Sequence, residues 1–324
     1  MPTHDTKKNF DHTIDTRQFV PNCNEISFRL DHFLTIRIPR LSRTQAQKII
    51  ENNAVTLKSQ RKPKNNTKIL PGEIVYLNRK QQKPILQLPE IELILQNEDF
   101  YVFNKPAGIL THPTATQYMN TMTAMLAKQQ YPQTWITHRL DKETSGLIIM
   151  AKSQNTAGQI TAMFKNSQIK KTYIAIADNT EKHFSGFQMG TFNTPLGFVG
   201  IHLPKITMGK GKLTAETHYK PIKYNNNKIM IELIPVTGRQ HQLRVHMALN
   251  NTPIFGDKLY YYGEKQYKNY LDAKEHTRFY PERLMLHAQK LQIPWKNQLL
   301  TITAPTPPEF NEFWNEIPEN TPNT

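Results

Sequence analysis

The segment 138-HRLDKETSGLIIMAK-152 carries the densest chemical information in the chain, because ionisable and hydroxyl side chains run directly into an apolar stretch. The apolar part, residues 147–150, is rich in branched side chains and lies between a glycine and a lysine, a pattern that predicts a buried strand. The polar residues would then form the loop at the start of that strand. In this loop Asp141 lies between Arg139 and Lys142, whose positive charges would keep the carboxylate ionised.

A surface turn is the structural alternative for this loop. In that case Asp141, Thr144 and Ser145 would only form hydrogen bonds with the local backbone, as these residue types often do in turns. The loop alone leaves both interpretations open.

The composition favours a nucleic-acid partner. The chain has 324 residues, enough for two domains, and carries a net charge of +15. Nucleic acid and an anionic membrane surface would both attract this charge. However, the sequence has no long apolar span, no signal-peptide pattern and no obvious amphipathic basic helix with exposed aromatic residues. We therefore expect binding to nucleic acid and no association with a membrane.

The cysteine and histidine content argues against a metal site. Cys23 is the only cysteine, which excludes an intramolecular disulfide and a multi-cysteine zinc site and fits a reducing, cytoplasmic location. His241 and His246 are close in sequence and could in principle bind zinc. Their separation of five residues places them on different faces of a helix and no third ligand is evident, so we expect no metal.

Changes in composition divide the chain into five parts. Residues 1–24 are polar and basic without an apolar period, and we expect a flexible arm. A small domain follows over 25–80, and a proline-bearing linker over 81–89. The main domain spans 90–304. The tail, 305–324, is rich in Pro, Asn and Glu and is expected to be loosely ordered, although Phe310, Phe313 and Trp314 could anchor part of it.

The small domain is expected to present a basic face. Asp31 and Ser42 are predicted to cap its two helices, and strands are predicted at 55–57 and 74–77. Basic side chains on or beside the helices would bind phosphates with a strong salt dependence. The candidates are Arg29, Arg40, Arg43 and Lys48. An ordinary solvated surface is the structural alternative for these residues.

The small domain also resembles a known RNA-binding motif. The SR-x-x-A-x-x-I-I spacing, the V-T strand and the PG turn, within residues 26–77, look like the alpha-L motif of the ribosomal-protein-S-four type. The sequence departs from that motif at Lys58 and Ser59, where Asn-Gly is common. The resemblance implies that this domain binds RNA.

The main domain has the pattern of an α+β fold. Helices are predicted at 123–129 and 153–164, the second with Ser153 as its cap. The predicted strands are 91–95, 100–103, 147–150, 170–177, 216–219, 228–234 and a final pair that ends near Thr303. Residues 178–212 lack a clear period and are expected to form loops and short strands. Residues 260–282 are polar and aromatic and are expected to be an insertion or a long loop.

The segment 237-TGRQHQLRVHMALNN-251 is predicted to start a helix, because Thr237 and Gln240 have the spacing of a capping box. On that helix Arg239, Leu243 and His246 would share one face, at steps of four and three residues. A guanidinium in the first turn would point out of the helix start. Arg239 could therefore meet a carboxylate there.

Six motifs occur in the order seen in RNA pseudouridine synthases of the RluA family. They are KPAGILTHP (105–113), HRLDKETSGLIIMAK (138–152), KKTYIAIA (170–177), TGRQHQLRVHMA (237–248), PIFGDKLY (253–260) and RLMLHAQKL (283–291). The pair HRLD-x-x-TSG and TGR-x-HQLR-x-H is more specific than any single short motif. The resemblance covers roughly residues 90–300. With the alpha-L domain in front, the chain is similar to the enzymes of this family that modify large-subunit ribosomal RNA.

This resemblance implies a pseudouridine synthase fold, in which a central mixed, largely antiparallel sheet is flanked by helices and loops. It also implies conversion of uridine to its carbon-linked isomer. The glycosidic bond breaks, the uracil turns, and a new bond forms through carbon five. No metal, nucleotide or organic cofactor is expected. The expected partner is structured ribosomal RNA, and the expected state is a monomer.

By motif position, the resemblance makes Asp141 the catalytic aspartate, whether it attacks the anomeric carbon, attacks the base or abstracts a ribose proton. Arg239 would form the charge-assisted pair that keeps this carboxylate ionised and aimed. Tyr173 would stack on the uracil and could help to remove the proton from carbon five. Leu243 would pack below Tyr173.

Other residues of the opening segment are expected to contact RNA. A base in a folded stem must be extruded before a buried carboxylate can reach its sugar, at a cost of about a few kcal/mol. Arg139 is placed to occupy the vacated stack or to hold the neighbouring phosphate. His138 and Thr144 complete the expected set. His138, like His246, has the alternative role of a packed, hydrogen-bonded side chain.

Two other functions remain as alternatives. A non-catalytic RNA-binding or ribosome-assembly protein would need none of Asp141, Tyr173 and Arg239 at these positions. A hydrolase could use Asp141 and Glu143 as a carboxylate pair, but glycosidases need two carboxyl groups about 5 to 9.5 Å apart across the scissile bond. A basic chain with one well-placed aspartate fits RNA isomerisation better.

Overall fold

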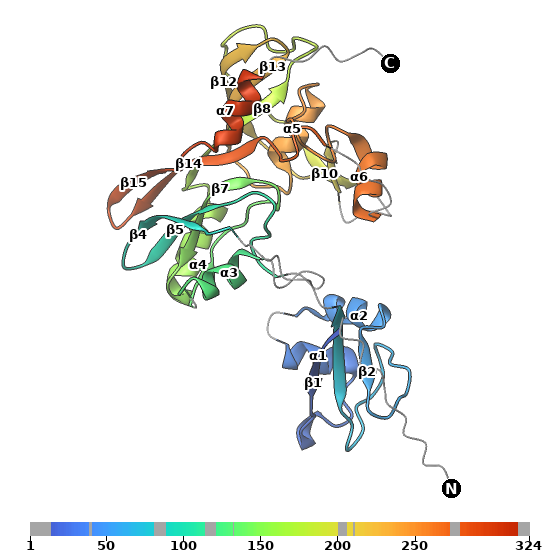
Figure 1. The fold of residues 1–324 in the computed structure, drawn as a ribbon. Coiled ribbons are helices and arrows are strands. Elements are labelled where there is room, and N and C mark those ends of the chain that lie inside the picture. Colours follow the sequence, from blue (N-terminus) through green and yellow to red (C-terminus); the bar gives the residue numbers. More distant parts are fainter. Residues whose placement is uncertain are drawn as a thin grey trace. The chain divides into compact units, whose positions relative to one another are not determined.

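The computed structural model describes residues 14–38, 41–80, 89–113, 121–131, 133–199, 206–209, 211–272 and 279–316. Contacts within the chain separate two compact units. Unit 1 comprises Met1–Gln87 with Pro113–Asn120, and unit 2 comprises Leu88–His112 with Thr121–Thr324. Figure 1 shows the elements of each unit.

Unit 1 contains two helices and a small antiparallel sheet. The sheet has the order β1-β3-β2 and is formed by β1 (Ile14–Phe19), β3 (Val75–Lys80) and β2 (Val55–Leu57). A 3-10 turn at Cys23–Glu25 precedes α1 (Leu30–Arg37), which contacts α2 (Arg43–Glu51). The helices and the sheet share one apolar core, which includes Leu30, Phe33, Leu34, Ile50, Val75 and Leu77.

The predicted cap of the second helix is confirmed, and that of the first is wrong. Ser42 Oγ accepts a hydrogen bond from the Gln45 amide, and Gln45 Oε1 accepts one from the Ser42 amide. Asp31 lies inside the first turn of α1, because Arg29 is the N-cap residue there. The buried Asp31 carboxylate accepts hydrogen bonds from arginine side chains and from the His32 amide instead.

The described part of the expected flexible arm forms a strand. β1 pairs with β3 from Ile14–Lys80 to Phe19–Val75, and Phe19 is buried in the core of unit 1. The three residues before Phe19 are polar and exposed. The strand therefore carries too little apolar alternation to be recognised from its sequence. Residues 1–13 of the expected arm lie outside the described part of the chain.

Unit 2 is built on one mixed sheet. Its described strands follow the order β4-β5-β7-β14-β8-β13-β12-β9, with β15 paired to β14 and β6 paired to β7. The strands are β4 (Glu92–Gln96), β5 (Phe100–Lys105), β6 (Trp135–Ile136), β7 (Ser145–Ala151), β8 (Lys170–Asp178), β9 (Gly190–Phe192), β12 (Thr217–Asn225), β13 (Lys228–Pro235), β14 (Leu286–Trp295) and β15 (Gln298–Thr303). Among these described strands, β7 and β14 form a parallel pair and the other pairs are antiparallel. The predicted mixed, largely antiparallel sheet is confirmed.

Helices and a separate hairpin complete unit 2. The described elements are α3 (Met122–Lys128), α4 (Gln154–Lys165), α5 (Gln242–Leu249), α6 (Gly263–Asp272), α7 (Pro308–Asn315) and the antiparallel pair β10 (Leu196–Val199) and β11 (Ile206–Gly209). α4 contacts β6 and β7, and α5 contacts β13 and β11. Ser153 Oγ accepts a hydrogen bond from the Thr156 amide, which confirms the predicted cap of α4.

In the described part of the chain, no helix has the length and apolar character needed to cross a membrane.

Two segments expected to be loops contain helices. α7 lies in the expected loose tail, and its side chains Phe310, Phe313 and Trp314 are buried in the same cluster as β8 and β13 residues. Their spacing of three and four residues places them on one helix face. α6 lies within 260–282, a segment whose polar and aromatic residues show no clear helical period of apolar side chains. Residues 273–278 and 317–324 are outside the described part.

The contact between β7 and β14 requires a glycine at position 146. His287 pairs with Ser145, and Ala288 pairs with Gly146. Gly146 has a φ of +114°, and a Cβ at this position would lie 2.3 Å from the Ala288 carbonyl oxygen. This close approach fixes the start of β7, and thereby the end of the loop that carries Asp141, against β14.

Candidate active site

The loop before β7 is fixed by the neighbouring loop that follows β5. Thr111 Oγ1 donates a hydrogen bond to the Leu140 carbonyl oxygen over 3.1 Å and accepts one from the Leu140 amide over 3.3 Å. The Thr144 amide donates to the Asp141 carbonyl oxygen over 3.2 Å and closes a turn. The backbone on both sides of the Asp141 side chain is therefore held in place.

Lys105, the last residue of β5, ties the same two loops together. Its fully buried Nζ donates hydrogen bonds over 2.9, 2.8 and 3.1 Å to the carbonyl oxygens of Pro106, Ile109 and Lys142. Burial lowers the pKa of Lys105 to about 7, although two nearby carboxylates oppose this shift. An ammonium has three protons to donate, and each has a backbone acceptor here. Lys105 thus acts as a clamp between the two loops.

The side chain of Asp141 faces Arg244 of α5. The Asp141 side chain is 27 % exposed, and its Oδ2 lies 3.5 Å from Arg244 Nη1. Arg244 Nε and Nη2 donate over 2.6 and 2.8 Å to the two carboxylate oxygens of Asp257. This bidentate geometry holds a guanidinium in one orientation. The fully buried Asp257 therefore directs the remaining nitrogen of Arg244 toward Asp141.

Both members of this buried pair stay charged. Burial disfavours the charge of Arg244, but Asp257 and Asp141 outweigh this effect and raise the pKa of Arg244. Burial also disfavours the charge of Asp257, but Arg244 holds the pKa of that carboxyl below its usual range. The amides of Leu259 and Tyr260 each donate to Asp257 Oδ1 over 3.0 Å. A fixed positive charge therefore stands beside Asp141.

His241 approaches the same Asp141 oxygen as Arg244, and Tyr260 contacts both His241 and Arg244. His241 Nε2 is 3.8 Å from Asp141 Oδ2, and His241 Nδ1 is 3.0 Å from the Tyr260 hydroxyl oxygen. Burial lowers the pKa of His241, and the charge of Arg244 adds to this effect while Asp141 opposes it. His241 is therefore neutral near pH 7, and Arg244 supplies the positive charge that faces Asp141.

The structure corrects the predicted pairing of Asp141 with Arg239. The Arg239 side chain is exposed, and its Nε donates a hydrogen bond to the Thr214 carbonyl oxygen over 3.0 Å. Arg244, five residues further along the chain, takes the place that the sequence assigned to Arg239.

The reason for this correction is the position at which α5 begins. The helix begins at Gln242, and its N-cap residue, His241, has a left-handed φ of 55° and makes no side-chain cap. Gln242 Oε1 accepts hydrogen bonds from the Thr237 hydroxyl over 2.7 Å and from the Arg239 amide over 3.0 Å. A side chain inside the helix therefore closes the preceding turn, and the predicted capping box of Thr237 with Gln240 does not start α5. Arg239 lies before the helix.

Tyr173 lies on β8 within reach of the charge on Asp141. It pairs with Leu233 of β13 and Ala288 of β14, and it packs against a cluster that includes Leu243. Burial raises the pKa of Tyr173, and the negative charge of Asp141 adds to this effect. The hydroxyl of Tyr173 is therefore protonated at neutral pH. The structure therefore places Tyr173 near Asp141 and packs it against the apolar cluster that contains Leu243.

His138 is packed inside the unit, whereas Arg139 is exposed. His138 Nε2 accepts a hydrogen bond from the Ile149 amide over 3.0 Å, and its ring centroid is 4.1 Å from that of Phe164. Burial lowers the pKa of His138 to about 3, and the charge of Lys171 adds to this effect. These contacts favour the structural alternative for His138. RNA contacts by Arg139 and by the buried Thr144 stay predictions.

His246 also makes structural contacts. It is fully buried, its Nδ1 is 2.9 Å from Thr217 Oγ1, and its Nε2 is 3.1 Å from the Thr194 carbonyl oxygen. A carbonyl oxygen only accepts, so Nε2 carries the proton and Nδ1 accepts from the threonine hydroxyl. Among the described residues, no group of three or more His, Cys, Asp or Glu side chains could hold a metal ion.

In unit 1, a buried carboxylate organises two exposed arginines. Asp31 Oδ2 lies 3.1 Å from Arg29 Nη2 and 3.2 Å from Arg43 Nε, and it accepts a hydrogen bond from Gln47 over 3.0 Å. Burial would raise the pKa of Asp31, but these three partners hold it well below its usual range. The exposed Lys48 follows on α2. The fourth candidate of this face, Arg40, lies outside the described residues.

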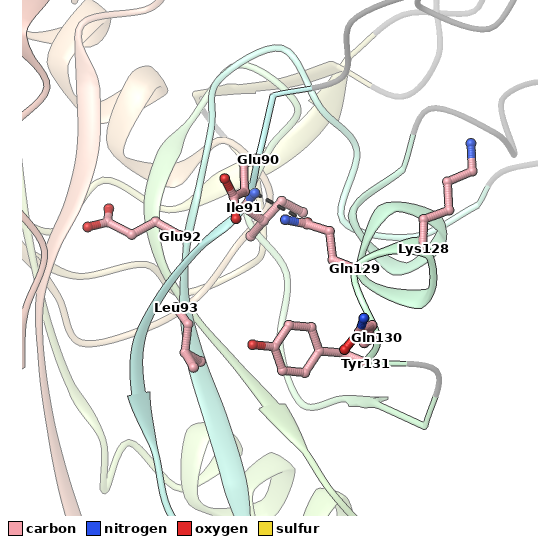
Figure 2. A pocket seen from close by; sticks show the side chains of 8 residues that line it. All are labelled: Glu90, Ile91, Glu92, Leu93, Lys128, Gln129, Gln130 and Tyr131. Carbon is pink, nitrogen blue, oxygen red and sulfur yellow. Dashed lines mark hydrogen bonds between the residues drawn. The ribbon is translucent and has the colours of Figure 1, made fainter.

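Unit 2 also contains a pocket of about 540 Å³, shown in Figure 2, that is separate from the residues around Asp141. Its lining comes from β4 and the end of α3 and comprises Glu90, Ile91, Glu92, Leu93, Lys128, Gln129, Gln130 and Tyr131. The Ile91 amide donates a hydrogen bond to Gln129 Oε1 over 3.3 Å and bridges the two elements. The residues that hold Asp141 do not line this pocket, and its two glutamates would repel a polyanion.

Comparisons with known proteins bear on the same region. A family model described as RNA pseudouridylate synthase matches residues 99–249. This span contains Asp141, Tyr173 and Arg244. Ribosomal large subunit pseudouridine synthase D of Buchnera aphidicola is 29 % identical over 321 residues, which cover 94 % of this chain and 99 % of that protein.

A second relative and a solved structure agree with this match. An uncharacterized RNA pseudouridine synthase of Haemophilus influenzae is 32 % identical over 232 residues, 69 % of this chain and 91 % of that protein. The structure of human RNA Pseudouridylate Synthase Domain Containing 1 superimposes with a TM-score of 0.57 at 23 % identity, over 72 % of this chain and 91 % of that one. At this identity the solved structure supports the fold alone. Because the relatives match over nearly their whole length and the fold agrees, the chain belongs to the RluA-type family of RNA pseudouridine synthases.

Proposed function

We propose that the protein isomerises specific uridines of large-subunit ribosomal RNA to pseudouridine, with Asp141 as the catalytic aspartate. The observation that carries this proposal is the position of Asp141, which is partly exposed on a fixed loop and faces the buried Arg244–Asp257 pair. The choice of RNA is supported by relatives whose names specify the ribosomal large subunit, such as the Buchnera protein.

The chemistry needs no oxidant or reductant. The bond from the anomeric carbon to N1 breaks, the uracil turns, and a bond from the same carbon to C5 forms. C5 loses its proton, and N1 gains one. The carboxylate of Asp141 can serve as a nucleophile or as a base in this sequence, and the charge of Arg244, 3.5 Å from its Oδ2, orients it.

Tyr173 and Leu243 would form the wall against which the uracil rests. An aromatic ring stacks on any base, and this contact contributes about 1–3 kcal/mol in complexes with single-stranded nucleic acid. The hydroxyl of Tyr173 stays protonated near neutral pH, so little phenolate is present to act as a base, and the side chain suits a hydrogen bond to the uracil better than removal of the C5 proton. Arg139, exposed on the same loop as Asp141, is available to fill the stack that the extruded base leaves.

Unit 1 would supply affinity for the RNA. Arg29 and Arg43 have side chains that are 46 % and 57 % exposed, and both are oriented by Asp31. Guanidinium groups held in this way can contact backbone phosphates without losing much side-chain entropy. The net charge of +15 supports the same partner, and the single cysteine, which permits no intramolecular disulfide, supports action in the reducing cytoplasm.

The substrate is tested by mapping pseudouridines in ribosomal RNA from a strain that lacks this protein. We expect one or more pseudouridines of the large-subunit RNA to be absent and to return when the wild-type gene is supplied. The matched control is a gene that encodes Asp141→Asn, which should not restore them. An unchanged set of pseudouridines in the deletion strain would contradict the proposed substrate and favour a non-catalytic role in ribosome assembly.

A further inference from the structure

We propose that Lys171, with the turn around Gly238 and Arg239, forms a binding site for a backbone phosphate of the RNA next to the target uridine. The proposal rests on the proposed function, because it assigns this site to the nucleotide that adjoins the catalytic one. It gives a role to a lysine that the sequence motifs and the chemistry of Asp141 leave unused.

Lys171 lies on the same face of β8 as Tyr173. Side chains two residues apart in a strand point to the same side of the sheet, and they are separated by about 7 Å along the strand. The burial pattern agrees, because Lys171 and Tyr173 are both partly exposed while Thr172 between them is buried. The distance between neighbouring phosphates in an extended RNA strand is similar to this separation. If the uracil stacks on Tyr173, a neighbouring phosphate falls near Lys171.

The ammonium of Lys171 lies near two of the motif segments, residues 138–152 and residues 237–248. Its positive charge acts on His138, at the start of the segment that carries Asp141. On the other side, Lys171 Nζ is 3.9 Å from the position that a Cβ on Gly238 would occupy. The pairing of β13 with β8 ends at Leu233 and Tyr173, so β13, which continues to pair with β12 as far as Pro235, does not pair with β8 at Lys171. The turn that contains Gly238 fills that place.

Lys171 has no anionic partner within the described ranges. No hydrogen bond or ion pair of its Nζ is formed with any described residue, and burial lowers the pKa of Lys171 without an opposing carboxylate. A partly buried cation without a counter-ion costs free energy, which an anionic ligand would offset. The clamp at Lys105 differs, because three carbonyl oxygens accept its hydrogen bonds.

The turn beside Lys171 is open to a ligand. Gly238 is exposed, and apart from Lys171 Nζ no atom lies within 4 Å of a Cβ built on it. The absence of a side chain at Gly238 lets a phosphate approach the backbone closely. The exposed Arg239 is adjacent in the chain, and although its Nε donates to the Thr214 carbonyl oxygen, its other guanidinium nitrogens would add a second positive charge for the same phosphate. A doubly cationic site with an open backbone suits the phosphodiester of RNA.

The test compares Lys171→Met and Lys171→Gln, which remove the charge, with Lys171→Arg, which keeps it. The control is Lys170→Met, because Lys170 is the preceding residue on the opposite face of β8 and is exposed. Affinity for a ribosomal RNA fragment is measured with the full-length protein over a range of salt concentrations, and turnover is measured on the same RNA. A thermal unfolding curve for each variant separates loss of binding from loss of the fold.

We expect both neutral variants to reduce the slope of log affinity against log salt by about 1, which corresponds to one lost phosphate contact. KM should rise about tenfold with a smaller change in kcat, because the contact is made before and during the reaction. Lys171→Arg should restore the slope, and Lys170→Met should keep it. A wild-type slope in a folded neutral variant would overturn the proposal. If the wild-type protein binds RNA but does not isomerise it, the proposed function fails, whereas the slopes still decide the role of Lys171.

Discussion

Replacing Asp141 by asparagine is expected to lower the rate of pseudouridine formation at least about 10⁴-fold, because the amide can act neither as a nucleophile nor as a base. RNA affinity should stay close to that of the wild type, since loss of one negative charge from a basic surface removes no phosphate contact. The rate is measured by nucleoside analysis of the RNA after a single turnover, and affinity is measured by filter binding. Retained turnover would contradict the role of Asp141.

The matched control for this substitution is Glu143→Gln. Glu143 is the other carboxylate of the loop, and its Oε2 lies 3.4 Å from Lys258 Nζ, an ion pair at the side of the site. We expect Glu143→Gln to retain turnover within about one order of magnitude, because partly exposed ion pairs contribute about 0–1 kcal/mol. A loss as large as that of Asp141→Asn would instead favour a mechanism with two carboxylates.

Arg244→Met is expected to damage both the fold and the reaction. The side chain of Arg244 is 9 % exposed and that of Asp257 is fully buried, so the substitution leaves a buried carboxylate without its partner. Breaking a buried pair in this way destabilises a protein by about 3–5 kcal/mol. Turnover of the folded fraction should fall about 10²-fold or more, because Asp141 loses the group that orients it. Urea unfolding and single-turnover rates measure the two effects.

Two variants make the Arg244 result specific. Arg239→Met removes an exposed guanidinium from the same segment and should change the free energy of unfolding by less than about 0.5 kcal/mol. The double variant Arg244→Met with Asp257→Asn also removes the unpaired negative charge of Asp257. It should regain part of the lost stability without regaining turnover. Equal stability losses for Arg239→Met and Arg244→Met would contradict the assignment of the buried pair.

The parts of the fold with strong local signals could be predicted from the sequence. The LIIM run becomes the fully buried strand β7, and the KKTYIAIA segment becomes β8 with Tyr173 beside the site. Ser42 and Ser153 cap helices as predicted, because an N-cap is a contact between residues three positions apart in sequence. Such features depend on a few neighbouring residues, and the sequence shows all of them.

The partners of Asp141 could not be predicted in the same way. The capping-box spacing pointed to Arg239, but the side chain of Gln242 folds back and delays the helix start, which brings Arg244 to the site. Asp257 is distant in sequence and lies in the motif PIFGDKLY, for which no individual residue role was predicted. The signal that could have found the pair is the arginine in HQLR together with the aspartate in FGDK. Both lie inside motifs of the family.

Long-range packing explains the remaining differences. β1 has few apolar residues, and α7 is a short helix with three apolar side chains on one face; each is stabilised by surfaces formed elsewhere in the chain, β3 for β1 and the cluster of β8 and β13 for α7. No role was predicted for Lys105, the first residue of the motif KPAGILTHP. Its three carbonyl partners come from two separate loops, and no local pattern indicates that arrangement.

The central claim is that Asp141 isomerises uridine within RNA, and tritium release tests it most directly. Isomerisation removes the hydrogen from C5 of uracil, so RNA labelled with tritium at C5 loses one tritium for each pseudouridine formed. We predict that the wild-type protein releases tritium from large-subunit ribosomal RNA fragments in that ratio, and that Asp141→Asn releases none. No release by folded wild-type protein that binds the same RNA would contradict the claim.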